Sequence, residues 1–270
     1  MAKPKYKPKK IGIVADLHCG SKWGLLSPDN EEHKQNVGQT YLWDCWLHLA
    51  KTWGKLDMLI INGDMIDGKQ RKSDGTGILT ANLSEQADMA IECVEAFVER
   101  TAPTKIIRSA GTPYHEGFDG TLKHFDTRFG LKRRQVHGLD PFDIVLADGI
   151  IINVKHHPEG AAALYLGTLQ DRETLWATIT EDRQGLPRAQ FLIRSHLHMY
   201  GRFDGCGKIH AITPCFQLQT PYAKKQKYYR WHPTIGGIML KYDEMHDEVY
   251  HVVKTTYDLP RRKAVNYADI

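Results

Sequence analysis

Histidine and aspartate residues follow five short apolar runs of this 270-residue chain, at the point where each run ends. In order along the chain they are Asp16 and His18, Asp64 and Asp67, His115 with Glu116, His156 with His157, and finally His196 and His198. Each run has the length and composition of a β-strand. Ligands bind at the carboxyl ends of strands in open α/β sheets, so these distant residues are expected to meet in one crevice.

The residue types in this crevice indicate a metal centre. Carboxylates and imidazoles gathered together are costly to bury, and divalent cations would neutralise the acids and order the rings. Oxygen and nitrogen ligands without thiolates suit zinc, manganese, iron or nickel better than calcium or magnesium. Any single pair could be an ordinary turn or surface pair. Pairs at five strand ends favour a site for two divalent metal ions.

The elements that must position these residues alternate in the first half of the chain. Strands are predicted over residues 11–15, 57–61 and 105–109. Amphipathic helices are predicted over residues 41–53 and 83–100. Strand, helix and strand at this spacing predict parallel βαβ units.

The second half predicts a mixed or second sheet. Residues 143–146 and 150–155 read as a hairpin turned at Asp148 and Gly149. A helix is expected around residues 171–183, with strands over 190–194, 208–213, 235–242 and 248–255. The expected fold class is α/β, a four-layer α/β/β/α sandwich of two mixed sheets flanked by helices.

The strand-end motifs resemble those of the calcineurin-like metallophosphoesterases. The matching segments are Asp16-Leu17-His18, Gly63-Asp64-Met65-Ile66-Asp67, the lone His156 and His196-Leu197-His198, in family order over about residues 11–200. The resemblance implies that Asp16, His18 and His198 hold one metal ion, with Asp64 bridging to a second. It implies that His156 and His196 complete the second metal site. It also implies hydrolysis of phosphate esters by a water molecule that the two metals activate.

One motif departs from the family pattern. The family's third motif reads Gly-Asn-His-Asp or Gly-Asn-His-Glu, whereas this chain has Gly111-Thr112-Pro113-Tyr114-His115-Glu116. Either Thr112 takes the place of the asparagine, or His115 itself reaches the metal. We predict that His115 is functional, as a metal ligand or as the acid that protonates the leaving group.

Two smaller points concern the surroundings of the ligands. Asp67 or Glu116 is expected to hold the imidazoles in one tautomer, and Asp67 is predicted with His115 as a catalytic residue. Ser195 stands where the family commonly has glycine, which is tolerated if the backbone φ of Ser195 stays negative.

Composition and charge indicate a globular protein without export or membrane signals. The chain is 41% hydrophobic and 25% charged, with a net charge of +4. No apolar run approaches the roughly 18 residues of a membrane span, or forms a signal-peptide core. We therefore expect no membrane partner. The five scattered cysteines lack a C-x-x-C pair, which fits a reducing cytoplasm. We expect one domain over residues 11–257, a basic N-terminal tail over 1–10 and a C-terminal tail over 258–270.

Two long loops, over residues 19–36 and 68–80, are expected to overhang the metals. They carry Lys22, Trp23 and Arg71, which we predict to bind substrate, although solvated loop charges are the commoner explanation. Residues 222–231 interleave cations with aromatics, either as a surface for single-stranded nucleic acid or as a packed surface loop. The prediction is a phosphodiesterase acting on nucleotides or nucleic acid. The alternatives are a DNA or RNA nuclease of the same family, and a catalytically silent binding module with the same fold.

Overall fold

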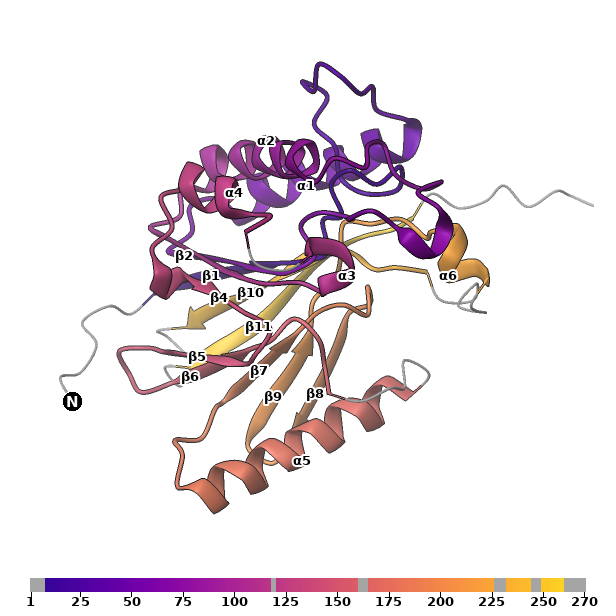
Figure 1. The fold of residues 1–270 in the computed structure, drawn as a ribbon. Helices are drawn as coiled ribbons and strands as arrows, with labels where there is room; N and C mark the ends of the chain where they lie inside the picture. The colour runs from indigo at the N-terminus through magenta and orange to yellow at the C-terminus, as the bar shows by residue number, and fades with distance from the viewer. Residues whose placement is uncertain (1–7, 118–119, 160–164, 226–231, 244–248, 260–270) are drawn as a thin grey trace, which may run out of the picture.

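Two mixed β-sheets pack face to face, with helices on their outer sides (Figure 1). The computed structural model describes residues 8–117, 120–159, 165–225, 232–243 and 249–259. The first sheet has six strands in the order β11-β10-β1-β2-β3-β4. Their bounds are Lys10–Val14 for β1, Met58–Asn62 for β2, Lys105–Ser109 for β3, Val136–His137 for β4, Ile235–Asp243 for β10 and Val249–Tyr257 for β11. Strands β1 to β4 run parallel, and β10 and β11 add an antiparallel edge.

The second sheet has five strands in the order β5-β6-β7-β9-β8. Their bounds are Phe142–Val145 for β5, Ile151–Val154 for β6, Phe191–Arg194 for β7, Gly201–Gly205 for β8 and Lys208–Ile212 for β9. Strands β6, β7 and β9 are parallel, and the edge strands β5 and β8 are antiparallel to their neighbours. Both sheets therefore have a parallel centre whose strands end on a common edge.

Helices cover the outer face of each sheet, which confirms the predicted α/β/β/α sandwich. Helices α1 (Val37–Trp53), α2 (Leu83–Thr101) and α4 (Lys123–Arg128) lie over the first sheet, and α5 (Leu166–Gln184) lies over the second (Figure 1). The short helices α3 (Pro113–Glu116) and α6 (Pro221–Lys225) and the 3-10 turns η1 (Arg71–Ser73) and η2 (Arg133–Gln135) lie in the connections. The described residues contain no helix with the length and apolarity needed to cross a membrane.

Alternating side chains of the central strands divide between two cores. In β1, Ile11 and Ile13 point into the layer between the sheets, whereas Val14 packs toward the helices. In β2, Ile60 faces the other sheet and Ile61 faces the helices. A period of two with apolar residues on both faces is the pattern of a buried parallel strand, which explains the continuous apolar runs of the sequence.

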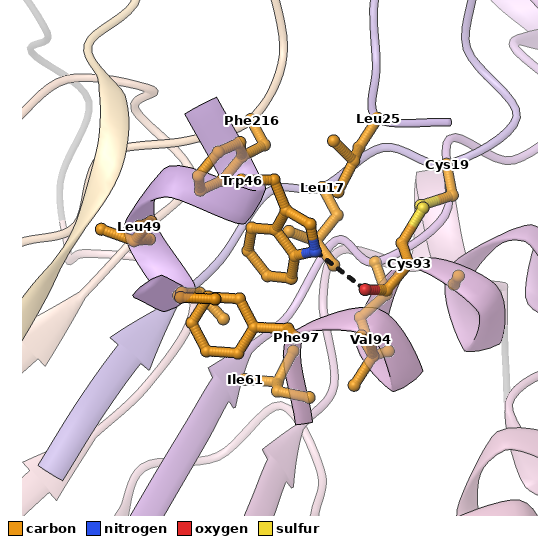
Figure 2. Packing of buried hydrophobic residues seen from close by; sticks show 14 of the residues in the cluster. Leu17, Cys19, Leu25, Trp46, Leu49, Ile61, Cys93, Val94, Phe97 and Phe216 are labelled. Atoms are coloured by element: carbon orange, nitrogen blue, oxygen red, sulfur yellow. Dashed lines mark hydrogen bonds between the residues drawn. The ribbon is translucent and has the colours of Figure 1, made fainter. Parts of the chain in front are cut away.

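The helical core is built around Trp46 of α1 (Figure 2). Its ring centroid lies 4.3 Å from that of Phe97 and 4.7 Å from that of Phe216. The buried indole Nε1–H donates a 2.8 Å hydrogen bond to the carbonyl oxygen of Cys93 in α2, so the one polar atom of this ring is paired. This packing fixes α1 and α2 to the sheet whose strand ends carry the candidate ligands.

Most predicted elements are confirmed, with ends shifted by a few residues. The predicted hairpin is the β5–β6 pair, where Gly149 adopts a φ of 83°. The short strands β4 and β8 and the short helices were not predicted from the sequence.

The tail boundaries stay a prediction. The backbone amide of Lys9 donates to Asp57 at 2.8 Å, and the carbonyl oxygen of Asp258 accepts from Tyr41 at 2.7 Å, so both residues contact the domain. Residues 1–7 and 260–270 lie outside the described residues. So do residues 226–231 of the aromatic and basic segment.

Candidate metal centre

The predicted ligands come together where the parallel strands of both sheets end. Asp16 and Asp64 each follow a first-sheet strand by two residues, after β1 and β2. His156 and His196 occupy the same positions after β6 and β7 of the second sheet. The two sheets thus each supply part of one cluster.

A buried amide joins the two sheets beneath this cluster. Asn62, the last residue of β2, donates from Nδ2 to Ser195 Oγ at 2.7 Å and to the carbonyl oxygen of Lys155 at 3.1 Å. Its Oδ1 accepts from Ser109 Oγ at 2.6 Å. The backbone φ of Ser195 is not positive, as the replacement of the family's glycine by serine requires.

Five candidate ligands have backbone in the left-handed region. The φ angles are 54° for Asp16, 47° for His18, 49° for Asp64, 69° for His196 and 56° for His198. Aspartate and histidine adopt this region more readily than most residues, yet each instance still costs about 1–3 kcal/mol and persists only where neighbours fix it. One such contact is the His18 amide, which donates to the carbonyl oxygen of Asp64 at 3.0 Å.

The first ligand group consists of Asp16, His18 and His198, whose ligand atoms lie within 4.8 Å of one another. His18 Nε2 lies 3.1 Å from His198 Nε2, and Asp16 Oδ1 lies 3.4 Å from His198 Nε2. His18 Nδ1 donates to Asp67 Oδ1 at 2.9 Å, so the Nε2 lone pair faces the cluster. These are the residues that the family resemblance assigned to one metal.

The second ligand group consists of Asp64, His156 and His196, again within 4.8 Å. His156 Nε2 lies 3.0 Å from Asp64 Oδ2, and His196 Nδ1 lies 3.8 Å from the same oxygen. His156 Nδ1 donates to the carbonyl oxygen of Asn62 at 2.6 Å, which orients its Nε2 toward Asp64. Asp16 Oδ1 lies 3.8 Å from His156 Nε2, so the two groups adjoin.

The polar atoms in these groups fit bound cations. Asp16 Oδ1, His156 Nε2 and His196 Nδ1 are buried without a hydrogen-bond partner among the described residues. Buried polar atoms of this kind are normally paired with a donor, an acceptor or a metal ion. Burial by itself would lower the pKa of His156, but Asp64 and Asp16 outweigh burial and raise that pKa to about 10. The carboxylates therefore attract positive charge, which divalent metal ions would provide.

His115 lies next to both groups. It forms a further cluster of ligand atoms with His18 and Asp64, and its ring centroid is 4.6 Å from that of His18. Thr112, the other candidate for the missing asparagine, donates instead from its backbone amide and Oγ1 to Asp64 Oδ1, at 2.6 Å and 3.0 Å. Of the two residues, the histidine is the one with a ring nitrogen within ligand range.

Asp67 and Glu116 have different partners. Asp67 accepts from His18 Nδ1 and, at 3.2 Å, from Gln217 Nε2, and a short contact joins it to Gln70 Nε2. Glu116 is buried and accepts from the backbone amides of Met65 at 2.9 Å and Gly111 at 2.6 Å. Asp67 therefore orients an imidazole, whereas Glu116 holds the backbone turns beside Asp64.

Three glutamines of this surrounding layer were not found by sequence reasoning. The amides of Asp67 and Gly68 donate to Gln86 Oε1 at 3.1 and 2.8 Å, and Gln70 and Gln217 contact the Asp67 carboxylate. No motif marks them. The one signal is that Gln86 lies next to Ala87 on the apolar face of α2, where a polar residue needs a buried partner.

A cavity of about 510 Å³ opens beside the cluster. Its lining includes His18, His115, His196 and His198 together with residues from the loops after β1, β2 and β9. Of the predicted substrate-binding residues, Trp23 lines the cavity. Lys22 and Arg71 do not belong to its lining, and Lys22 Nζ donates to the carbonyl oxygen of Thr76 at 3.1 Å. Lys72, next to Arg71, does line it.

The fold and the site define a two-sheet α/β protein with a cluster of candidate metal ligands at the strand ends. No protein-family model matches the chain. No curated protein sequence matches it.

Similar solved structures include zinc-complexed Vps29 from Entamoeba histolytica, a predicted phosphoesterase from Streptococcus pneumoniae and an archaeal phosphodiesterase. Their identities to this chain are 11%, 9% and 12%, with TM-scores of 0.44, 0.38 and 0.43. The matches cover 92%, 93% and 91% of this chain and 99% of each other chain. At such similarity the function of this chain has to be argued from its own site.

Proposed function

We propose that this chain is a calcineurin-like metallophosphoesterase that hydrolyses phosphodiesters of nucleotides or nucleic acid. The observation that carries the proposal is the pair of adjoining ligand groups, each with a carboxylate and two imidazoles. The first group would hold one divalent metal ion and the second group another, with Asp64 as the bridging carboxylate. Manganese, zinc, iron and nickel all suit these ligands.

When bound, two divalent ions polarise the phosphate and lower the pKa of water toward neutrality. The chain itself supports a proton donor. His115 Nδ1 lies 2.8 Å from the carbonyl oxygen of Asp67, and because a carbonyl only accepts, Nδ1 carries the proton. Nε2 is then the atom that exchanges a proton with the leaving group. The His115 side chain is 19% exposed and lines the cavity, so a substrate can reach it.

Charge in the cavity favours a diester. Apart from histidines, Lys72 is the one cationic residue among the described residues that line the cavity. A phosphodiester carries a single negative charge, so it requires less compensating charge than a polyphosphate. The apolar and aromatic lining also suits a substrate with a base attached.

The test measures hydrolysis of bis-p-nitrophenyl phosphate by metal-stripped protein after addition of manganese, zinc, nickel or iron. We expect turnover to return with metal, and two metal equivalents per chain by elemental analysis. His115→Ala should lower the rate on a dinucleotide by about 100-fold or more, because its alkoxide leaving group needs a proton from a general acid. The same variant should lower the rate on bis-p-nitrophenyl phosphate far less, because p-nitrophenolate leaves without being protonated. The matched control is His124→Ala, since the His124 side chain is 67% exposed and does not line the cavity.

The departure at Thr112 gives the silent binding module its one specific support. Absence of turnover with any metal would favour that module. A silent module need not bind two metal equivalents, so protein that binds no metal would overturn the hydrolase and leave the module standing. We also propose a cytoplasmic location, because all five cysteines are unpaired and reducing conditions would keep them so.

A further inference from the structure

The cavity beside the metal centre is mainly aromatic and apolar away from the histidines. Trp23, Tyr114 and Tyr222 line it together with Leu197 and Met199. Tyr114 is 40% and Tyr222 52% exposed, so both rings have accessible surface. Its volume of about 510 Å³ lies within the range of sites that hold one small ligand.

Trp23 is held in place by two other segments of the chain. Its carbonyl oxygen accepts from the amide of Leu218 at 2.8 Å. Its ring packs on Gly77, where an added Cβ would lie 2.6 Å from Trp23 Cζ3. Loops that follow β1, β2 and β9 thus fix this residue as a rigid wall, and little ordering is needed when a flat ligand stacks on it.

Tyr114 connects the aromatic lining to the chemistry. It directly precedes His115, and its hydroxyl accepts from the backbone amide of Lys72 at 3.2 Å. Lys72 Nζ lies 5.5 Å from the Tyr114 ring centroid. This arrangement places an ammonium and an aromatic ring together at the edge of the cavity, the combination that proteins use for a phosphate next to a base.

We infer that this cavity is a base-binding subsite, which receives the base of one unpaired nucleotide while its phosphodiester lies at the ligand groups. The inference rests on the proposed function and adds where the nucleoside lies and in what form. A base inside a duplex is stacked and paired, so it would have to be unpaired before it could enter. The preferred substrate is therefore a mononucleotide ester or a single-stranded end.

The experiment compares two esters that share a leaving group. Thymidine 5′-(p-nitrophenyl phosphate) carries a base, and methyl p-nitrophenyl phosphate does not. In both, a water oxygen bonds to phosphorus and the bond from phosphorus to p-nitrophenolate breaks, which leaves thymidine 5′-monophosphate or methyl phosphate. We expect kcat/KM for the thymidine ester to exceed that for the methyl ester by about 5- to 150-fold, the range that stacking of one base supports.

Two variants locate the effect. Trp23→Leu removes the stacking surface. An alanine Cβ at Gly77 would lie 2.6 Å from Trp23 Cζ3 and 2.4 Å from Gln70 Oε1, so Gly77→Ala displaces both side chains. Both variants should bring the ratio of the two kcat/KM values toward one. The matched control is Trp176→Leu, because Trp176 is 55% exposed on α5 and does not line the cavity. Its ratio should equal that of the unsubstituted protein.

The possible failures are distinguishable. Equal kcat/KM values for the two esters, or a ratio unaffected by Trp23→Leu, would overturn the subsite and leave the hydrolase intact. If neither ester turns over, calorimetric binding of thymidine 5′-(methyl phosphate) to the metal-loaded protein decides the matter. Binding that Trp23→Leu weakens by at least about 5-fold would support the subsite in a protein without hydrolysis. Absence of binding would overturn both proposals.

Discussion

Asp67 shows how one buried carboxylate fixes the ligand next to it. Its side chain accepts from three donors, on His18, Gln217 and Gln70. A carboxylate satisfies all of them, whereas an amide has one oxygen and must turn its NH2 toward at least one donor. The tautomer that presents His18 Nε2 to the first ligand group therefore depends on the two acceptor oxygens of Asp67.

Asp67→Asn should weaken metal binding by about 10- to 100-fold, because an oriented partner of a ligating histidine contributes this much. Competition with a chelator of known affinity measures the effect. Asp88→Asn is the matched control, since the Asp88 side chain is 54% exposed and away from the ligand groups. Equal metal affinity in Asp67→Asn and the unsubstituted protein would contradict the positioning role.

Gly111 is a residue whose lack of a side chain the site requires. An added Cβ would lie 2.1 Å from the backbone nitrogen of Asp64 and 2.2 Å from its Oδ1. Gly111→Ala must therefore displace Asp64, and we expect a loss of about 1–3 kcal/mol in unfolding free energy and weaker binding at the second ligand group. Urea unfolding and metal titration measure the two effects.

Gly138→Ala is the control for that substitution. Nothing lies within 4 Å of a Cβ placed there, so the change in unfolding free energy should stay within about 0.5 kcal/mol. If the Gly111→Ala protein matches Gly138→Ala in unfolding free energy and in metal affinity, the loop that carries Asp64 accommodates the added methyl group at little cost.

At the scale of elements, the packing of α5 on β9 encloses a neutral histidine. His210 of β9 is fully buried, with Nδ1 3.2 Å from the carbonyl oxygen of Gln170 and Nε2 3.7 Å from Glu173. Burial is the main cause that lowers its pKa to about 4, with a smaller opposing contribution from Glu173 and a further lowering from Arg194.

The depressed pKa makes this packing sensitive to acid. Between about pH 6.5 and 4 the unfolded chain binds a proton that the folded chain does not, so stability falls as the pH falls. From pH 7 to pH 5 the loss from this residue should be about 2 kcal/mol. Urea unfolding at both pH values measures it, with His210→Phe for comparison.

The comparison with His210→Phe isolates the contribution of His210, because the contributions of all other ionisable groups are shared by the two proteins and cancel. We expect the pH 7 to pH 5 difference to shrink by about 2 kcal/mol in the variant. An unchanged difference would show that His210 is protonated in the folded state.

Elements with a strong pattern were predictable, and short ones were not. Strand β3 and helix α2 have continuous apolar runs or a clear apolar face, and both were predicted within a residue or two. Strand β8, by contrast, is an edge strand with exposed alternate residues, and it turns into β9 through Cys206 and Gly207, both with positive φ. A Cys-Gly turn is not a common hairpin signal, so the sequence did not predict strand β8.

The candidate site was predictable to a similar extent and for a similar reason. Its ligands follow strands, and parallel strands bring their carboxyl ends to one edge, so local sequence predicts which residues meet. The partners of Asp67 come from a loop, a helix face and the segment after β9. Their meeting depends on how distant segments pack, which residue spacing does not encode.

At the scale of the whole molecule, the metal centre depends on how the two sheets are joined. The contacts that join them include the apolar layer that contains Ile13 and Leu240, and the hydrogen bonds of Asn62 beneath the ligands. The apolar layer contributes stability without fixing position finely, since hydrophobic attraction is not directional. The Asn62 hydrogen bonds are directional and lie where the strands of the two sheets end.

Asn62→Leu tests this division of roles. The substitution removes the partner of Ser109 Oγ and of the Lys155 carbonyl oxygen, whereas Ser195 Oγ keeps its contact with Thr213 Oγ1. We therefore expect a loss of about 2–4 kcal/mol in unfolding free energy. It should also weaken metal binding, because the ligands after β2 and β7 are no longer held in register. Leu240→Ala should cost a similar 2–5 kcal/mol through a cavity in the apolar layer, yet leave metal affinity unchanged. Metal titrations of the two variants at matched stability separate the effects. Equal metal affinities would mean that the apolar layer alone aligns the sheets. Weaker metal binding in Asn62→Leu would assign that alignment to the buried amide.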